Sequence, residues 1–299
     1  MPSYLETVNA ALAGAAARCP DLLQFGENIG QGSRICGLAR GLGGRLLTVG
    51  NCENTHAGAG LGMMLEGGRA LLVVKQLDFL LLALDQLVNT MNLIRTSEAV
   101  TGSFTILAIV CDQGWQGPQS SFHDLAGICS LARVNGYYLN GAADSARVLE
   151  AELGSPGFRM IAVSQRRFGD PALDLPVVSA AGNHGEVQYA AGQAATVVAF
   201  GFALPQAWVL AQDIARDEGS PAAVFQINPV LPHQWPSVVA AAARSGRLIV
   251  LDDGKGALSL AHKLVSSVLR AAPGCQVTMH TREAAEPSAV HDDRFMVAA

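Results

Sequence analysis

One acidic residue, Glu53, stands at the start of a glycine-rich segment and is the first candidate for chemistry. The tract from Asn51 to Arg95 continues with an apolar strand and a long apolar helix. A carboxyl group walled by Leu, Val and Met side chains loses solvation on folding, which favours its protonated form near neutral pH and suits a catalytic acid. Acidic residues at helix starts also cap free amides and stabilise the helix dipole, so a structural role for Glu53 is the alternative.

The composition limits the classes of protein and partner. The chain has 299 residues, enough for two domains with separate cores. Charged residues make up 15% and hydrophobic residues 50%, so we expect a large buried subunit interface and an obligate oligomer. The net charge of -5 argues against nucleic acid or an anionic membrane as a partner, because both attract basic surfaces.

The sequence indicates neither a membrane segment nor a cysteine-based site. No run of about 18 apolar residues occurs, and the apolar run from Phe79 to Leu84 is interrupted by Asp85 and Gln86. The N-terminal residues lack the basic and apolar regions of a signal peptide, so we expect a cytoplasmic protein. The six cysteines form no CxxC pair and are interpreted as reduced thiols, with no zinc site or disulfide framework. We predict no metal ligands on this chain.

Short apolar strands alternate with helices, which predicts mostly parallel sheets covered by helices on both faces. The first predicted domain, residues 1–170, begins with a helix from Tyr4 to Arg18 and contains a long helix from Leu80 to Thr96. Residues 171–191 contain prolines and glycines without a periodic run and are predicted to be a linker. Residues 192–299 are predicted to form a second three-layer α/β/α domain, followed within that range by an acidic tail.

The order of several motifs resembles that of the transketolase-like thiamine diphosphate enzymes, specifically the beta subunits of 2-oxoacid dehydrogenases and the C-terminal halves of split transketolases. A strand leads to the turn GEN at residues 26–28, and residues 50–53 take the place of a PxSE-like motif. A glycine-rich helix follows, then an F-x-x-F-like motif around Phe79 and an intact D-Q-x-x-N at residues 85–89. The tracts VVAFG and RLIVLDDGKGALS extend the resemblance over nearly the whole chain.

The resemblance implies a pyrimidine-binding domain followed by a transketolase C-terminal-like domain. It also implies that Glu53 contacts the N1′ nitrogen of the cofactor's aminopyrimidine and so activates thiamine diphosphate. Gln76 takes the place of the first aromatic residue of F-x-x-F and, like Glu27, is a candidate to bind the cofactor, which leaves Phe79 as the aromatic candidate to stack on the pyrimidine. Met63 is a candidate for the apolar wall of the cofactor site. Glu27 is expected to bind the neighbouring loop or, across a symmetric contact, Glu53.

The loop after the third long strand contains two candidates for a catalytic side chain. In many relatives a histidine of this loop protonates or orients the substrate carbonyl. Ser120 takes that place in the simplest alignment, and His123 lies three residues later. Either is a candidate for catalysis, although a histidine beside Asp124 at a helix start is also typical of a cap region. Lys75 stands where many of these beta subunits have an acidic residue, and His56 faces either the cofactor or the solvent.

The family's GDG motif, which with a later asparagine holds magnesium and the diphosphate, does not occur in this sequence. The resemblance therefore implies half of an enzyme, whose α-type partner subunit carries the GDG…N site, Mg²⁺ and the diphosphate end of the shared thiamine diphosphate. We expect an α2β2 heterotetramer with a contact between the two beta chains. An acyl or lipoyl carrier protein is a further candidate partner.

Three functions follow from the resemblance. The first is a transketolase-like transferase that moves a two-carbon ketol or acyl unit and is active only with its partner subunit. The second is the beta subunit of the first component of a 2-oxoacid dehydrogenase, of the pyruvate or branched-chain type. The third is a non-catalytic supporting subunit. A generic nucleotide-binding domain is disfavoured because G-x-G-x-x-G after a strand and G-x-x-x-x-G-K-[ST] do not occur.

Overall fold

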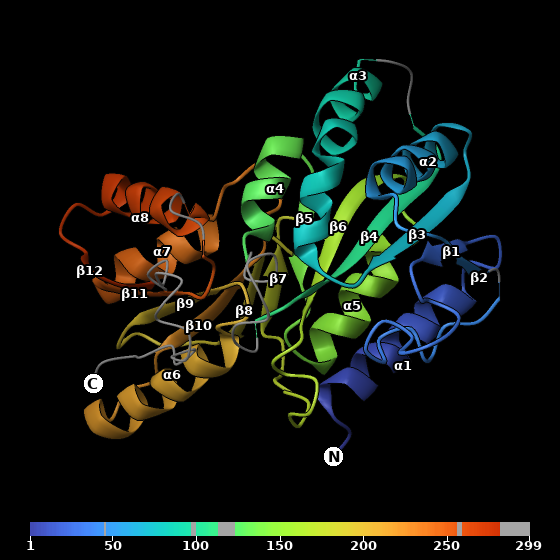
Figure 1. Cartoon of the computed structure of the whole chain (residues 1–299). Coiled ribbons are helices and arrows are strands. Elements are labelled where there is room, and N and C mark those ends of the chain that lie inside the picture. Colours follow the sequence, from blue (N-terminus) through green and yellow to red (C-terminus); the bar gives the residue numbers. More distant parts are fainter. Residues whose placement is uncertain (45, 97–99, 113–122, 256–258, 282–299) are drawn as a thin grey trace, which may run out of the picture. The chain divides into compact units, whose positions relative to one another are not determined.

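The protein consists of two compact α/β units, Met1–Asp174 and Leu175–Ala299 (Figure 1). The structure, a computed structural model, describes residues 1–44, 46–96, 100–112, 123–255 and 259–281. Each unit is built on a six-stranded, mostly parallel sheet with helices on both faces. This architecture confirms the fold class predicted from the alternation of strands and helices.

The sheet of the first unit is parallel throughout and has the strand order β2-β1-β3-β4-β6-β5. Its central strands are apolar and buried on both faces, as a helix-covered parallel sheet requires. The six strands are β1 (Leu23–Gly26), β2 (Leu46–Thr48), β3 (Arg69–Val74), β4 (Ser103–Val110), β5 (Asn135–Tyr138) and β6 (Gly157–Ser164).

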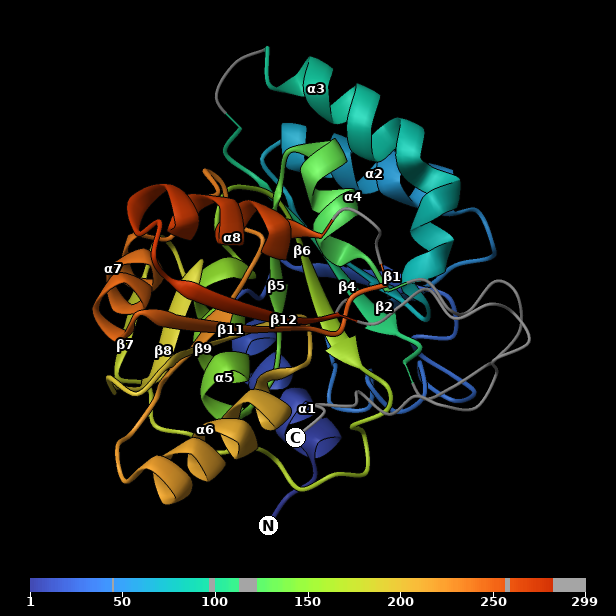
Figure 2. The same ribbon diagram turned by 90° about the vertical axis from the view of Figure 1, so that its left-hand side faces the viewer.

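Helices lie on both faces of this sheet (Figure 2). One face is covered by α1 (Tyr4–Ala17) and α5 (Ala142–Glu152), and α1 begins with a capping box in which Ser3 and Glu6 each bind the other's backbone N–H. The other face carries α2 (Glu53–Leu65), α4 (Leu125–Ala132) and a bent helical segment. That segment consists of the 3-10 helix η1 (Leu77–Ala83), the π-helix η2 (Gln86–Thr90) and α3 (Met91–Ile94).

The bent segment differs from the single helix that was expected from Leu80 to Thr96. The parts Leu77–Ala83 and Gln86–Ile94 meet at 73°. An apolar run predicts a buried helix but does not fix its winding, and here the chain changes from 3-10 to π hydrogen bonding within one run. Within the described ranges no single helix is long and apolar enough to cross a membrane; this bent pair passes that test by length and composition only.

The second unit has the strand order β12-β11-β9-β10-β8-β7, in which β8 pairs antiparallel with both β10 and β7. The segment 171–191, expected to be a linker, contains β7 and β8, because an antiparallel edge hairpin does not need the long apolar run of a central strand. The strands are β7 (Ser179–Ala181), β8 (Glu186–Ala190), β9 (Thr196–Phe200), β10 (Ala223–Ile227), β11 (Arg247–Asp252) and β12 (Gln276–Thr281).

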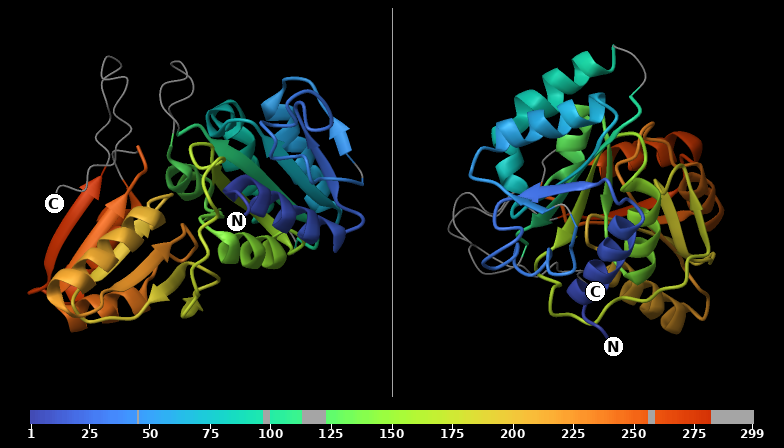
Figure 3. Two further views of the ribbon diagram at one scale, coloured as in Figure 1. Left: turned by 90° about the horizontal axis from the view of Figure 1, so that it is seen from below. Right: turned by 90° about the vertical axis from the view of Figure 1, so that its right-hand side faces the viewer.

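Three helices cover the second sheet. One face carries α6 (Leu204–Glu218), and the other carries α7 (Pro236–Ser245) and α8 (Leu260–Ala271) (Figure 3). Trp235, Val238 and Leu264 pack with Phe225 of the sheet in one buried cluster. The cap of α7 comes from Glu186, whose carboxylate accepts hydrogen bonds from the start of that helix.

Candidate active site

A pocket lies at the carboxyl edge of the first sheet, beside the first turn of α2. Because β1 and β3 are parallel neighbours, their carboxyl ends meet at this edge. Gly26 allows this arrangement, since a Cβ atom at that position would clash with the carbonyl oxygen of Val73. The free space of the pocket and the solvent at its open mouth together amount to about 320 Å³. Its lining consists of Glu27, Glu53, His56, Leu72, Val73, Val74, Lys75, Phe79 and Leu80.

Glu53 is the first residue of α2, and its side chain is half-buried at this pocket. The residue before it, Cys52, makes no side-chain hydrogen bond that caps the helix. Glu53 shares a hydrogen bond with the carboxyl group of Glu27, which directly follows β1. Glu27 and Glu53 therefore meet within one chain, whereas the sequence predicted that Glu27 binds the neighbouring loop or, across a symmetric contact, Glu53.

The carboxyl group of Glu27 holds a proton more tightly than an isolated glutamate does. Burial raises the pKa of Glu27, and the negative charge of Glu53 and the hydrogen bond between the two raise it further. Lys75 acts in the opposite direction and lowers the pKa of Glu27. A hydrogen bond between two carboxyl groups requires one of them to be protonated. The pocket can therefore hold a proton between the two carboxyl groups and deliver it to a bound base.

His56 lies one turn after Glu53 and is nearly buried, with 9% of its surface exposed. Its ring meets the ring of Phe25 edge to face, with centroids 6.3 Å apart. Burial lowers the pKa of His56, against the opposing effects of Glu53 and of a hydrogen bond to the backbone of Gly50. His56 lines the pocket, so of its two expected orientations the structure shows the one toward the candidate site.

Beside the four charged or polar residues, the pocket is lined by apolar side chains of β3 and η1, among which Phe79 is aromatic. Phe79 lies on η1, half-buried, opposite the end of β3. Gln76, the residue before η1, does not line the pocket; its side chain binds the thiol of Cys111, whose pKa burial raises to about 11. Met63 also lies outside the lining, because it is ten residues after Glu53 on α2, which is about 15 Å along the axis. Its expected place in the cofactor wall is not supported.

Of the two candidate residues of the loop, the structure describes only His123. Ser120 lies outside the described residues. His123 is buried, with 1% of its surface exposed, and is not among the residues that line the Glu53 pocket. Its neighbour Asp124 caps α4 by accepting a hydrogen bond from the backbone N–H of Gly127 at 2.7 Å. Burial raises the pKa of Asp124, and the nearby His123 lowers it. The arrangement matches the cap-region alternative for this pair.

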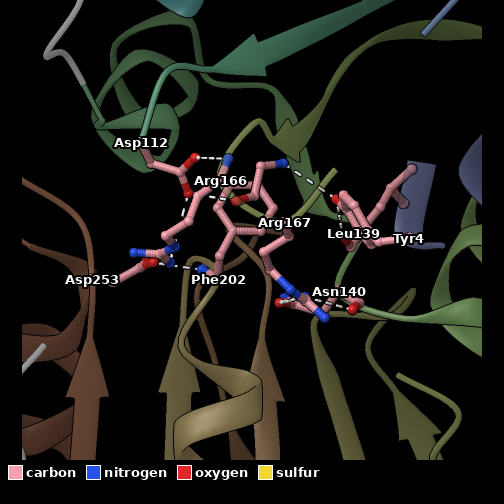
Figure 4. A network of polar contacts seen from close by, with 9 residues as sticks. Tyr4, Asp112, Leu139, Asn140, Arg166, Arg167, Phe202 and Asp253 are labelled. Carbon is pink, nitrogen blue, oxygen red and sulfur yellow. Dashed lines mark hydrogen bonds and ion pairs between the residues drawn. The ribbon is translucent and has the colours of Figure 1, made fainter. Parts of the chain in front are cut away.

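A buried polar network holds the carboxyl ends of β4 and β6 (Figure 4). Asp112, two residues after the end of β4, accepts hydrogen bonds from the Ser164 hydroxyl at 2.5 Å and from the Arg166 N–H at 2.8 Å. The hydroxyl of Tyr4 donates to Leu139 O at 2.6 Å and accepts from Ser164 N at 3.2 Å. The network thus ties α1 to the ends of the central strands and makes this edge of the sheet a rigid support.

Sequence reasoning did not identify this network, because its partners are far apart along the chain: Tyr4 and Ser164 are 160 residues apart. The guanidinium of Arg167 lies 4.8 Å from the centre of the Tyr4 ring and donates to Asn140 O at 2.6 Å. Burial raises the pKa of Tyr4, so its hydroxyl stays protonated as a donor. Within the described ranges no group of three or more His, Cys, Asp or Glu side chains converges as a metal site.

Comparisons with known proteins agree with this fold. No protein-family model matches the chain. Two curated proteins of Arabidopsis thaliana, the chloroplastic pyruvate dehydrogenase E1 component subunits beta-3 and beta-2, are each 26% identical to it over 156 residues. These matches cover 47% of this chain and 38% of either relative, so they span less than half of the relatives' length.

Two solved structures share the architecture over nearly the whole chain. A split-gene transketolase, described as an inactive beta4 tetramer, superposes with a TM-score of 0.70 at 16% identity and covers 95% of this chain and 89% of that one. Transketolase from Campylobacter jejuni superposes with a TM-score of 0.68 at 11% identity, covering 93% of this chain and 42% of that one. The chain therefore has the transketolase-like fold that its sequence motifs predicted.

Proposed function

We propose that the chain is one subunit of a two-component, thiamine diphosphate-dependent transketolase-like enzyme that transfers a two-carbon ketol or acyl unit. The observation that carries the proposal is the hydrogen-bonded pair of Glu27 and Glu53 beside apolar side chains in the pocket at the start of α2. In this proposal Glu53 supplies the acid that activates the aminopyrimidine of the cofactor. The resemblance of the motifs and the transketolase-like fold support it.

The residues present fit an aminopyrimidine ring. The ring is flat and carries weakly basic nitrogens, so it needs apolar walls, an aromatic or aliphatic face and a proton donor. Leu72, Val74 and Phe79 offer the apolar surfaces, and the carboxyl pair offers the proton. When bound, thiamine diphosphate supplies the electron sink that stabilises carbanion chemistry. Glu53 would hold a proton at the ring nitrogen, and Glu27 would orient Glu53 and share its proton.

The proposal requires a second chain. The sequence contains no GDG motif, and this chain covers 42% of the single-chain transketolase but 89% of the split-gene one. We infer that an α-type subunit with a GDG…N site holds the diphosphate and Mg²⁺, and that two copies of each chain form a heterotetramer. The catalytic histidine or serine of the loop is part of the same proposal, with Ser120 and His123 as candidates. A cytoplasmic location also stays a prediction.

Replacing Glu53 by Gln tests the proposal. The change keeps the shape of the side chain and removes the proton that the carboxyl group exchanges, so turnover of the reconstituted enzyme should fall about 100-fold or more. Glu66→Gln is the matched control, because Glu66 is exposed at the other end of α2 and should leave turnover unchanged. Unchanged turnover of Glu53→Gln would show an idle carboxyl group and favour the supporting-subunit alternative.

A second candidate function is the beta subunit of a 2-oxoacid dehydrogenase first component. The likeness to two pyruvate dehydrogenase E1 beta subunits favours it. Incubating the reconstituted pair with xylulose 5-phosphate and, separately, with pyruvate or branched 2-oxo acids distinguishes the two functions by which donor is consumed. Acyl transfer to a lipoyl carrier protein would support the dehydrogenase, and consumption of the sugar phosphate would support the ketol transferase.

A further inference from the structure

The pocket contains a cation, Lys75, that the proposed function does not use. Lys75 directly follows Val74, the last residue of β3, and its exposed side chain lines the same pocket as the carboxyl pair. The strand pairing explains its position. Phe25 of β1 is in register with Leu72 of β3, so Glu27 and Lys75 both emerge at the same edge from strands about 4.8 Å apart.

The charges in the pocket balance when one proton is present. The hydrogen-bonded pair of Glu27 and Glu53 carries one negative charge when it is singly protonated, and Lys75 carries one positive charge. His56 stays neutral at pH 7, because burial lowers its pKa below the ordinary 6.5. The described lining thus contains two carboxyl groups, one neutral imidazole and one ammonium group.

The titratable side chains around the Glu27–Glu53 pair come from three elements of the first unit. The end of β1 brings Glu27, α2 brings Glu53 and His56, and the end of β3 brings Lys75. The described pocket residues of η1 are apolar, Phe79 and Leu80. Asp78, also on η1, is not among the lining residues and instead raises the pKa of Cys111. Lys75 is therefore the cation of this group that can oppose a second negative charge on the pair.

We propose that Lys75 is the counter-ion of the Glu27–Glu53 pair and eases the release of the proton that the two carboxyl groups share. Loss of the shared proton would leave two adjacent carboxylates in a half-buried pocket, and a neighbouring ammonium group stabilises that state. Lys75 acts through the pair and is thus a positioning residue. The catalytic meaning of the proposal rests on the proposed function, whereas its electrostatic part concerns this chain alone.

Carboxyl ¹³C NMR titration of the full chain, labelled at glutamate Cδ, tests the electrostatic part without cofactor or partner. Lys75→Met should raise the upper apparent pKa of the pair by roughly half a unit to one unit. Lys75→Gln should give the same shift, so the result does not depend on one substitution. Lys75→Arg keeps the cation and should restore the titration of the unmodified chain.

Arg69→Met is the matched control. Arg69 is a cation at the opposite end of β3, six residues or about 20 Å from Lys75, and forms an exposed ion pair with Asp21 at 2.7 Å. Its removal changes the net charge equally and should leave the titration of the pair unchanged. An unshifted or lowered pKa in both Lys75→Met and Lys75→Gln would overturn the proposal. So would a shift in Arg69→Met as large as theirs, since the effect would then be one of net charge.

The same variants separate this proposal from the proposed function. In the reconstituted enzyme, where the singly protonated pair is the active form, Lys75→Met should move the alkaline limb of the kcat profile to higher pH by the amount seen in the NMR titration. If the titration shifts while Glu53→Gln retains full turnover, the counter-ion proposal stands and the proposed function fails. If Glu53→Gln is inactive while the titration does not shift, the proposed function stands and the counter-ion proposal fails.

Discussion

Gly60 of α2 provides a sharp test of how the helix that bears Glu53 is positioned. A Cβ atom at position 60 would come within 2.6 Å of Cδ2 of Phe104 on β4, where ordinary carbon contacts are about 3.5–4.0 Å. Phe104 is fully buried and stacks on Phe158 with ring centroids 5.0 Å apart, so its ring has little room to move. Overpacking of this kind costs about 1–3 kcal/mol, and the gain in helix propensity from Gly to Ala offsets about 1 kcal/mol of it.

Gly60→Ala should therefore lower the free energy of unfolding by up to about 2 kcal/mol, taking the difference of those two contributions. Gly62→Ala is the matched variant on the same helix, because an added Cβ there meets no atom within 4 Å. It should stabilise the chain by up to about 1 kcal/mol. Urea denaturation followed by far-ultraviolet circular dichroism measures both. A Gly60→Ala variant as stable as Gly62→Ala would refute the close packing of α2 on the sheet.

Three further predictions concern single side chains. Because the folded pKa of His56 lies below 6.5, its contribution to stability is present above about pH 6.5 and lost as the pH falls; His56→Phe should remove that part of the pH dependence measured by denaturation at pH 5 and 7.5. The folded pKa of Glu27 lies above its ordinary 4.5, so its ionisation opposes folding as the pH rises; Glu27→Gln should be more stable than the unmodified chain at pH 7 and show no such gain near pH 4. Tyr4→Phe loses the hydrogen bonds to Leu139 O and Ser164 N and should lower the free energy of unfolding by about 1–3 kcal/mol in thermal or urea melts; an unchanged midpoint would show that the buried network contributes nothing.

Much of the fold follows from local patterns in the sequence. Short continuous apolar runs such as those of β4 and β9 predict strands buried between helices, and the structure has them there. The edge elements were harder to predict. The strand β2 is three residues long and half-exposed, and β7 is also three residues long, so neither has a run that stands out. These edge strands form because they pair with neighbouring strands, and that pairing depends on tertiary contacts that a local sequence pattern does not contain.

The candidate site was predictable only in part. The position of Glu53 between a loop and a glycine-rich helix, and the F-x-x-F-like motif around Phe79, singled out two residues that line the pocket. The contact of Glu53 with Glu27 within one chain was not predicted, since 26 residues separate them and the parallel pairing of β1 and β3 brings their elements together. Met63 shares a helix with Glu53, but helical rise alone places it at the far end. The prediction for Met63 did not take into account this distance of about 15 Å along the helix axis.

The central claim is that the carboxyl group of residue 53 binds a ring nitrogen of a thiamine-derived cofactor. A crystal structure of the chain assembled with its α-type partner, thiamine diphosphate and Mg²⁺ measures this directly. The account predicts that one carboxyl oxygen of Glu53 lies at hydrogen-bonding distance, about 2.6–3.0 Å, from the N1′ nitrogen of the aminopyrimidine, with Glu27 on its other side. A Glu53 side chain directed into bulk water, with the cofactor ring bound elsewhere, would contradict it.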